Sequence, residues 1–353
     1  MKAIRRKHKS HKTQLTRRPT LNDIAKALSV TPATVSKALR DSSDISREMK
    51  ELVKKTTKEL GYRPNLLARA LINQKTKILG VLVPDLRISF FSEALRGMYE
   101  EADAKGYECL FLVHDELDAK EKQKLEFLSD IHVDGLLLNP VGSKRNNQLY
   151  QRISQHGTRV VCWDRNLKEL GFRSVAINDV DASYKLTTQI IKEGRNRILF
   201  LGPHSGISVL KDRFKGYKMA LADNGIAFRS ELVLQSFRSV KDSHAKILEI
   251  QKGGIEFDAI VSIGGLITYG AGKAVIEMNR SIPGDVILGE FGDNDVVYKL
   301  GVPFYTINQN PYEIGKASTD MLIQMIETGK PDANFKDIII QSQVVQRLPI
   351  DGD

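Results

Sequence analysis

Hydrophobic and polar positions follow two different periodic patterns along this chain. Near the N-terminus, Leu21, Ile24, Ala25 and Leu28 recur at the spacing of an α-helix, which places their side chains on one stripe. From residue 78 onward, short apolar runs alternate with amphipathic stretches, the pattern of parallel βα units. The sequence therefore predicts a helical region followed by a larger α/β region.

Residues 20–40 predict two short helices joined by a turn at Ser29 and Val30. Thr31 is placed to cap the second helix, and Pro32 falls at its first position, where a missing N–H costs nothing. The side of this helix that faces the first one consists of Val35, Ala38 and Leu39. The outward face consists of Pro32, Ala33, Thr34, Ser36, Lys37 and Arg40. Such a face suits the phosphates and base edges of a DNA major groove; an ordinary helical hairpin with a basic rim is the alternative.

A third helix is predicted to begin after Ser46, which can cap it, and to end at Gly61. Its apolar side is predicted to consist of Met49, Leu52, Val53, Thr56 and Leu60. The apolar run LLARALI (66–72), with Asn65 as its cap, predicts a further brief helix. One or two turns are too short to be stable alone in water, so a partner must fold this segment.

The α/β region contains two series of buried-strand runs. The first comprises ILGVLVP (78–84), CLFLVH (109–114), GLLLNP (135–140) and RVVCWD (159–164). The second comprises SVAIND (174–179), RILFLGP (197–203), ELVLQSF (231–237), DAIVSIGG (258–265) and VILGEF (286–291). Because roughly 275 residues exceed one small domain, the predicted fold is two doubly wound parallel-sheet lobes. Small ligands bind such folds in the cleft at the carboxyl ends of the strands.

Positive charge is concentrated near the N-terminus. Residues 1–75 contain 19 Lys and Arg against 6 Asp and Glu, a net charge of +13, whereas the whole chain carries +10, which leaves −3 for residues 76–353. This distribution favours binding to DNA phosphates through counterion release. Residues 1–18 are basic without an apolar run, and they predict a disordered arm that adds nonspecific DNA affinity; a merely solvated tail is the alternative.

Other function classes find little support in the residues. No apolar span of eighteen residues occurs, and the basic N-terminus lacks the apolar core of a secretory signal, so a cytoplasmic protein that does not enter a membrane is expected. The seven histidines are scattered and no catalytic or metal-ligand motif occurs, so no enzyme activity, cofactor or metal is expected. Cys109 and Cys162 lie in predicted strands and are expected to be core thiols.

The segment from Thr20 to Leu71 resembles, without a gap, the headpiece of the LacI/GalR family of bacterial transcription regulators, through TLNDIAKALSVTPATVSKAL and GYRPNLLARAL. The resemblance implies base reading by Pro32, Ala33 and Lys37, and positions near phosphates for Thr31, Thr34, Ser36, Arg40 and Ser46. It also implies a hinge helix with Asn65, Ala68, Arg69 and Leu71. Leu71 would lever into the minor groove and kink the duplex. The family's usual turn glycine is Ser29 here, a difference expected to change little.

The remainder resembles the periplasmic-binding-protein-like core of the same family, most closely in FFSEALRGMYEEADAKGYE, VDGLLLNP, RFKGYKMAL and NQNPYEIGKAS. The resemblance implies a headpiece over 19–63, a hinge over 64–75, a core over 76–347 and a tail over 348–353. Lobe 1 would take about 76–175 and 309–336, and lobe 2 about 176–308 and 337–347. In the family, ligand-dependent lobe rotation moves the paired hinge helices. No leucine heptad follows Gln346, so a homodimer is expected.

The resemblance also names candidate effector contacts. Arg213 matches the family's cleft arginine, whose guanidinium suits ligand hydroxyls or a carboxylate. Asp164 matches a position that accepts sugar hydroxyls, and Phe90 and Phe91 follow the first strand, where the family places ring-stacking aromatics. Trp163 and Phe291 complete the candidate set. The alternatives are core positions for Phe91 and Trp163 and a turn-capping role for Asp164.

Several cleft positions depart from the family pattern. Ile88 and Ser89 replace its Asn-Pro, Gly264 and Gly265 replace its Asn-Asp, and the aspartate expected after VILG is displaced within 290–293. Two hydrogen-bonding groups are lost, so the cleft holds a less polyhydroxylated or a phosphorylated ligand, or ligand dependence is weak. As a hypothesis, Gly264 and Gly265 let backbone amides approach an anion at the start of the next helix.

Taken together, the sequence predicts a regulator, by expectation a repressor, that binds a pseudo-palindromic DNA operator as a dimer. A small metabolite, by default a sugar or sugar derivative, would control its DNA affinity from the cleft. A regulator of the same fold with lost or altered effector control is the alternative. A sugar-binding solute receptor is a weaker one, because a secreted carrier needs a signal sequence and no helix-turn-helix.

Overall fold

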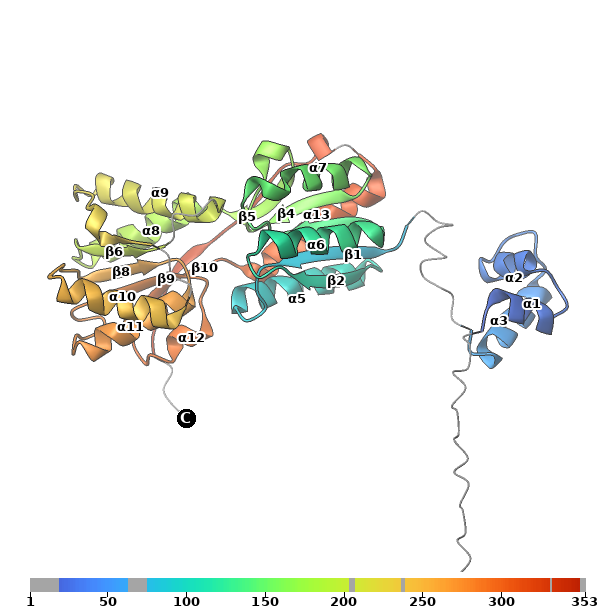
Figure 1. Cartoon of the computed structure of the whole chain (residues 1–353), viewed down its shortest axis with the longest axis horizontal. Coiled ribbons are helices and arrows are strands. Elements are labelled where there is room, and N and C mark those ends of the chain that lie inside the picture. The colour runs from blue at the N-terminus through green and yellow to red at the C-terminus, as the bar shows by residue number, and fades with distance from the viewer. Residues whose placement is uncertain (1–18, 63–74, 203–206, 236–238, 331, 350–353) are drawn as a thin grey trace, which may run out of the picture. The chain divides into compact units, whose positions relative to one another are not determined.

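The computed structural model describes residues 19–62, 75–202, 207–235, 239–330 and 332–349. The chain divides into two compact units, one ending at Gln74 and the other beginning at Lys75 (Figure 1). The described part of each unit has a hydrophobic core of its own. The headpiece is therefore a separate small domain, and the rest of the chain forms the core unit.

The headpiece consists of three described helices, α1 (Leu21–Ala27), α2 (Pro32–Leu39) and α3 (Arg47–Glu59). As the apolar pattern predicts, its buried side chains are Ile24, Ala25, Val35, Ala38 and Val53. The predicted burial of Leu52 and Leu60 is wrong, because they are 45% and 39% exposed. The buried side of α3 consists of Val53 and Thr56, and Leu52 lies beside it.

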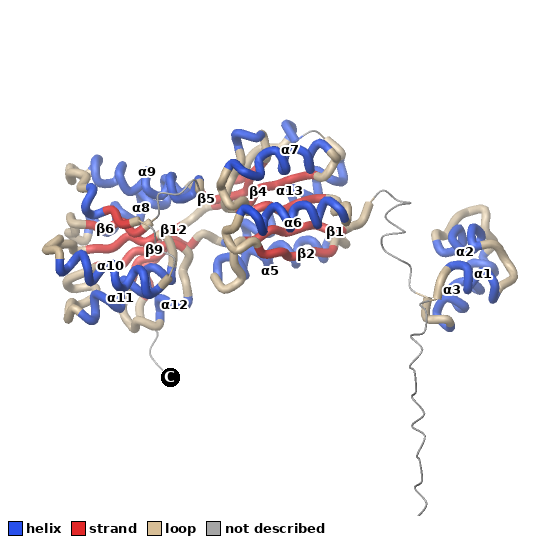
Figure 2. The backbone as a smooth tube through the Cα atoms, viewed as in Figure 1, coloured by secondary structure: helices blue, strands red, loops and turns tan. Residues whose placement is uncertain are grey.

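The first sheet of the core unit has the strand order β11-β5-β4-β3-β1-β2. Its strands are β1 (Ile78–Val83), β2 (Glu108–Val113), β3 (Gly135–Leu138), β4 (Arg159–Trp163), β5 (Arg173–Ile177) and β11 (Ile338–Ile340). All its described pairings are parallel. Helices α5 (Ser89–Ala104) and α13 (Pro311–Thr328) pack into one hydrophobic cluster with this sheet, and α6 (Asp118–Asp130) and α7 (Asn147–Gln155) into another. Figure 2 shows these helices beside the strands of the sheet. Side chains alternate between these clusters along β1, since Val81 joins the first and Leu82 the second.

The second sheet has the order β12-β10-β9-β8-β6-β7. Its strands are β6 (Ile198–Leu201), β7 (Val233–Leu234), β8 (Ala259–Ser262), β9 (Ile287–Phe291), β10 (Phe304–Asn308) and β12 (Gln343–Arg347). They run parallel except for β12, which pairs antiparallel with β10. Helices α8 (Asp179–Lys192) and α9 (Ser208–Asp223) share one cluster with the sheet, and α10 (Val240–Lys252) and α11 (Gly265–Glu277) share the other. A short helix, α12 (Asp295–Tyr298), follows β9.

The chain passes between the two sheets three times, after β5, after β10 and after β11. The last passage differs from the expected lobe boundary near residue 337. Ile338–Ile340 still pair with β5 of the first sheet, because this apolar run completes the sheet's edge, and the chain crosses only at residues 341–342. The nine predicted strands are present, although β7 keeps only two of the five described residues of its predicted run.

Candidate functional site

The capping residues of α2 fix where this helix begins and so which side chains lie on its outward face. The Thr31 hydroxyl accepts a hydrogen bond from the Thr34 N–H at 3.1 Å, and Pro32 occupies the first helical position. The turn before it contains Ser29 with a φ of +54°, a conformation that costs a residue with a Cβ and that glycine adopts freely. This explains why a glycine is usual in this turn.

The structure exposes the predicted DNA face. Thr31, Pro32, Ala33, Lys37 and Arg40 are exposed, and Thr34 and Ser36 are partly exposed. Ser46 caps α3 by accepting from the Met49 N–H at 3.3 Å. The Lys37 ammonium contacts the Asp44 carboxylate at 2.5 Å, a partner that the pattern did not predict. Asn65, Ala68, Arg69 and Leu71, together with the arm over 1–18, lie outside the described residues.

Arg213 of α9 is the centre of a buried polar network in the core unit. It is 6% exposed, and its Nε donates to the Asp179 carboxylate at 2.7 Å. Its Nη1 donates to the Ile263 carbonyl at 3.1 Å and its Nη2 to Gln309 Oε1 at 3.0 Å. The guanidinium also lies 4.1 Å from the centre of the Phe291 ring. Groups from the ends of four strands, β5, β8, β9 and β10, therefore converge on this arginine.

Burial raises the pKa of Asp179 to about 6 against the opposing charge of Arg213. Because burial disfavours the charged carboxylate, the arginine only partly offsets this cost. Asp164 of the first lobe also raises the Asp179 pKa, and Arg213 lowers that of Asp164. The candidate residues Asp164 and Arg213 therefore interact electrostatically although they belong to different lobes.

Asp164 lies directly after β4 with a φ of +60° and is 7% exposed. Its Oδ2 accepts from the Asn139 amide at 3.1 Å, while burial raises its pKa. Asn139 Oδ1 is buried and has no hydrogen-bond partner among the described residues. The neighbouring Arg165 donates to the Pro140 carbonyl at 2.8 Å and to Glu116. These contacts hold the loops after β3 and β4 in place.

Three of the candidate aromatic residues, Phe90, Phe91 and Trp163, form a continuous set on the first lobe, whereas Phe291 lies on the second. The Phe90 and Phe91 rings are 5.3 Å apart, and the Phe91 and Trp163 rings are 5.9 Å apart, both edge to face. Phe90 and Phe91 are 6% and 7% exposed, and Trp163 is fully buried. The Trp163 Nε1–H nevertheless has no acceptor among the described residues. Trp163 is therefore a core residue whose indole N–H is still free, among the described residues, to donate a hydrogen bond.

Asn294 occupies the space near the unusual glycines. A Cβ on Gly265 would lie 2.2 Å from the Asn294 Cβ, and a Cβ on Gly292 would lie 2.9 Å from Asn294 Nδ2. Gly264 has open space at this position and caps α11. Asn294 is held by Glu290, which accepts from its Nδ2 at 2.9 Å and its backbone N–H at 3.2 Å. Burial raises the Glu290 pKa to about 7.

Several polar residues of this cluster were missed by sequence reasoning, namely Asn139, Asp179, Glu290, Asn294 and Gln309. Asn139, Asp179 and Gln309 follow buried strands within two residues, which is the signal that identified Asp164. Applied to every strand end, that signal would have found them. Glu290 carries no such signal, because it lies within a strand whose other members are apolar or glycine.

The core unit holds no obvious catalytic cysteine. Burial raises the pKa of both Cys109 and Cys162 to about 12, which keeps them as thiols. Among the described helices, none has the length and apolar character needed to cross a membrane.

A capped helix-turn-helix domain joined to a two-lobed α/β core with a buried arginine network defines a DNA-binding transcriptional regulator with a ligand-binding core. Residues 20–65 match the family described as bacterial regulatory proteins, lacI family. Residues 76–348 match the family described as periplasmic binding proteins and sugar binding domain of LacI family. The chain belongs to the LacI family of bacterial transcriptional regulators.

Relatives and solved structures match over nearly the whole chain. The HTH-type transcriptional regulator RegA of Clostridium saccharobutylicum is 29% identical over 93% of this chain and 98% of its own length. The ribose operon repressor of Halalkalibacterium halodurans is 27% identical over 95% of this chain and 98% of its own. The Lac repressor dimer bound to operator and the anti-inducer ONPF has a TM-score of 0.78 at 20% identity, over 94% of this chain and 99% of that one. The last comparison shows the same fold.

Proposed function

We propose that this regulator represses transcription by binding a pseudo-palindromic operator as a homodimer in the cytoplasm. The observation that carries the proposal is the exposed, capped α2, which presents hydroxyls and the cations Lys37 and Arg40 on one outward face. Hydroxyls and cations on a recognition helix contact the phosphates and base edges of a major groove. The role is that of a regulator rather than of an enzyme, in keeping with its named relatives.

We assign the DNA contacts by position on this face. Pro32, Ala33 and Lys37 would read bases, and Thr31, Thr34, Ser36, Arg40 and Ser46 would contact phosphates. In the hinge, Asn65, Ala68, Arg69 and Leu71 would enter the central minor groove, with Leu71 as the wedge. A symmetric dimer reads two half-sites, which is why the operator is expected to be a pseudo-palindrome.

We further propose that a small polar metabolite, by default a sugar or sugar derivative, binds where Arg213, Asp164 and the aromatic set meet. The buried Asn139 Oδ1 and Trp163 Nε1–H lack partners among the described residues, and buried polar groups normally have one. Phe90, Phe91 and Phe291 add apolar faces to the same region. A ligand with both hydroxyls and an apolar ring face would satisfy this set.

The charge of the cleft favours a neutral ligand over an anion. Asp164, Asp179 and Glu290 are buried in the network, and all three have raised pKa values because of burial. The raised pKa values show that burial in this region disfavours negative charge, and a phosphate would meet the same desolvation cost. This weighs against anion binding at Gly264 and Gly265, and it supports the hydroxylated class suggested by a ribose-repressor relative.

A regulator with lost effector control is the second candidate, and one observation favours it. Nε, Nη1 and Nη2 of Arg213 already have protein partners, and Gly264, Gly265 and Gly292 offer no side chains. A cleft satisfied by its own residues has less need of a ligand. A solute receptor is the weakest candidate, because it would have no use for the headpiece.

DNA selection on the purified protein tests the proposal, repeated with a panel of sugars and phosphosugars at physiological salt. A palindrome whose enrichment changes with one neutral sugar supports the full proposal, and an insensitive palindrome supports the second candidate. Absence of any selected motif contradicts operator binding. Leu71→Ala is expected to weaken specific binding more than nonspecific binding, and equal losses would remove the wedge role.

A further inference from the structure

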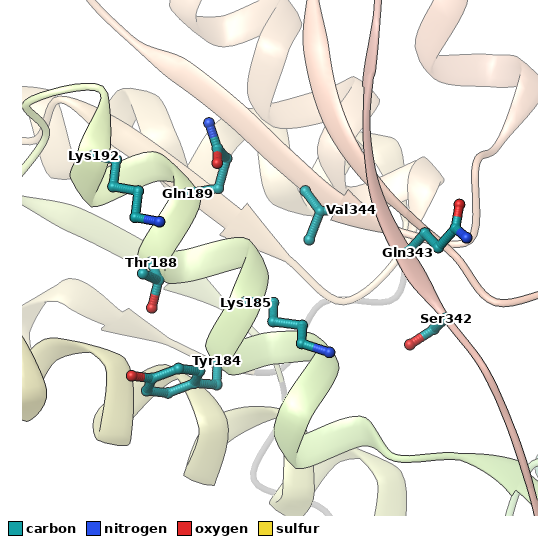
Figure 3. A pocket seen from close by; sticks show the side chains of 8 residues that line it. All are labelled: Tyr184, Lys185, Thr188, Gln189, Lys192, Ser342, Gln343 and Val344. Carbon is teal, nitrogen blue, oxygen red and sulfur yellow. The ribbon is translucent and has the colours of Figure 1, made fainter.

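A groove lined by both polar and apolar surface lies between α8 and strand β12 (Figure 3). Its volume is about 650 Å³, within the range of small-molecule sites. Tyr184, Lys185, Thr188, Gln189 and Lys192 line it from α8, and Ser342, Gln343 and Val344 line it from the other side. The residues of α8 recur at helical spacing, so one face of the helix supplies one whole wall.

Most of these side chains are hydrogen-bond donors without a partner. Thr188 Oγ1 is buried and unpartnered, an arrangement that requires an explanation in a folded protein. The side chains of Tyr184, Lys192, Ser342 and Gln343 have no hydrogen-bond or ion-pair partner within the described ranges. Of the labelled side chains, Lys185 points from α8 toward the opposite wall and Ser342 points from that wall toward α8 (Figure 3).

Two neighbouring acids each contact a lining residue of α8. Asp181 pairs with the Lys185 ammonium at 2.7 Å. Glu193 Oε1 accepts from the Tyr305 hydroxyl at 2.8 Å and from Gln189 Nε2 at 3.2 Å. Neither carboxylate belongs to the lining, so the lining contains two ammonium groups and no acid.

Backbone pairing and a hydrogen bond hold the wall opposite α8 in place. Ser342 belongs to the segment that joins the two sheets after β11, and Gln343 pairs with Asn308 at the end of β10. The preceding Gln341 carbonyl accepts from the Asn310 amide at 2.7 Å. Because two segments that cross between the lobes are tied together here, the donors of Ser342 and Gln343 are held opposite α8.

We propose that this groove is a second ligand site that binds a phosphate group, free or as the monoester of a small metabolite. The unpaired ammonium of Lys192 and the hydroxyl donors of the lining suit the oxygens of a tetrahedral dianion, since hydrogen bonds between ions of opposite charge are the strong ones. Lys192 supplies the unpaired charge, Thr188 the buried hydroxyl, and Ser342 with Gln343 the opposite wall. This site is separate from the effector region around Arg213, and it takes a ligand of different charge.

Isothermal titration of the full chain with glycerol 3-phosphate, inorganic phosphate and glycerol, at matched ionic strength, tests the proposal. Both phosphates are expected to bind saturably and glycerol is not; the tighter of the two phosphates identifies whether the ester or the free ion is preferred. Lys192→Gln is expected to weaken binding about tenfold, the usual effect of losing one charged hydrogen bond. Thr188→Val, which keeps the side-chain shape, is expected to weaken it as well.

Lys215→Gln is the matched control, because Lys215 is an exposed lysine of α9 outside the groove. Circular dichroism confirms that each variant is folded. No saturable binding of either phosphate overturns the proposal. So does binding that survives Lys192→Gln and Thr188→Val but is lost in Arg213→Lys, because the anion would then occupy the effector region.

Discussion

The Lys37 ammonium of α2 lies 2.5 Å from the Asp44 carboxylate, which belongs to the loop before α3. The hydrogen bond with Lys37 is the main cause that lowers the pKa of Asp44, to about 2. Both side chains are about half exposed, at 47% and 50%. Lys37 is one of the residues proposed to read bases. The Asp44 carboxylate therefore competes with DNA for the Lys37 ammonium, and this ion pair must break when DNA binds.

Asp44→Asn is therefore expected to raise affinity for a random-sequence duplex severalfold, because Lys37 no longer has to leave the Asp44 carboxylate before it contacts DNA. The dependence of affinity on salt should become steeper by up to about one unit on a log–log plot, since no cation is taken up by a freed carboxylate. Fluorescence anisotropy over a salt series measures both quantities.

A double-mutant cycle shows whether Asp44 acts through Lys37. The gain from Asp44→Asn should vanish in a Lys37→Ala background. Asp41→Asn is the matched control, because Asp41 carries the same charge in the same loop but pairs with Lys50 at 2.9 Å. An equal gain from Asp41→Asn would show a general charge effect instead.

Ser29→Gly is expected to stabilise the headpiece by about 1 kcal/mol or less. Glycine relieves the cost of the positive φ at this turn but loses more backbone entropy on folding. Hydrogen exchange of the α1 and α2 amides measures the change. Ser43→Gly is the comparison, because Ser43 is exposed in a neighbouring loop without a positive φ, and there the substitution should destabilise.

Arg213→Met should destabilise the core unit by about 3–5 kcal/mol, because it leaves the Asp179 carboxylate buried without its ionic partner. Arg213→Met combined with Asp179→Asn should be more stable than the single variant, since the unpaired charge is gone. Urea unfolding followed by the emission of Trp163, the single tryptophan of the chain, reports on this unit. Additive losses would mean that the two side chains do not act as a pair.

Glu290→Gln should flatten the dependence of core stability on pH. The pKa of Glu290 is raised from 4.5 to about 7 in the folded protein, so the fold binds this proton more tightly than the unfolded chain does. Its stabilising contribution is complete below pH 4.5 and is lost as pH rises through 7, a difference of about 3 kcal/mol. Asp179, whose pKa is about 6, and Asp164, whose pKa is also raised by burial, contribute to the slope left in the variant.

Unfolding at a series of pH values measures this effect. Glu231→Gln, at an exposed position, is the control and should leave the profile of the wild type unchanged. A Glu290→Gln profile identical to the wild type would show that the pKa of Glu290 is the same in the folded and unfolded chain, which contradicts the raised value.

Local signals were sufficient for the headpiece. The caps Thr31 and Ser46 and the proline at 32 act within one helical turn, and each lies where the pattern predicts. The prediction that Leu52 is buried was wrong because too many positions were assigned to the apolar side of α3. Contacts with α1 and α2 decide which side of α3 is covered.

The core unit needed more than local signals. Its strands with continuous apolar runs were predictable, because both faces of a parallel strand are covered by helices. Strand β12 was missed because it pairs antiparallel at an edge and reads QVVQR, with polar residues at both ends and in its fourth position. Its place beside β10, and the groove it forms with α8, depend on pairing between distant segments.

The sequence by itself determined the order of the headpiece helices and of the first nine strands, the charge of the headpiece and the choice of Arg213 and Asp164 as candidates. Periodicity, capping and net charge depend on residues close together, so they can be read without the fold. Only the tertiary structure decided which groups meet: Arg213 with Gln309, Glu290 with Asn294, and Lys37 with Asp44. Burial and hydrogen-bond partners arise when distant segments pack, and they set the pKa values and the unsatisfied groups on which ligand binding depends.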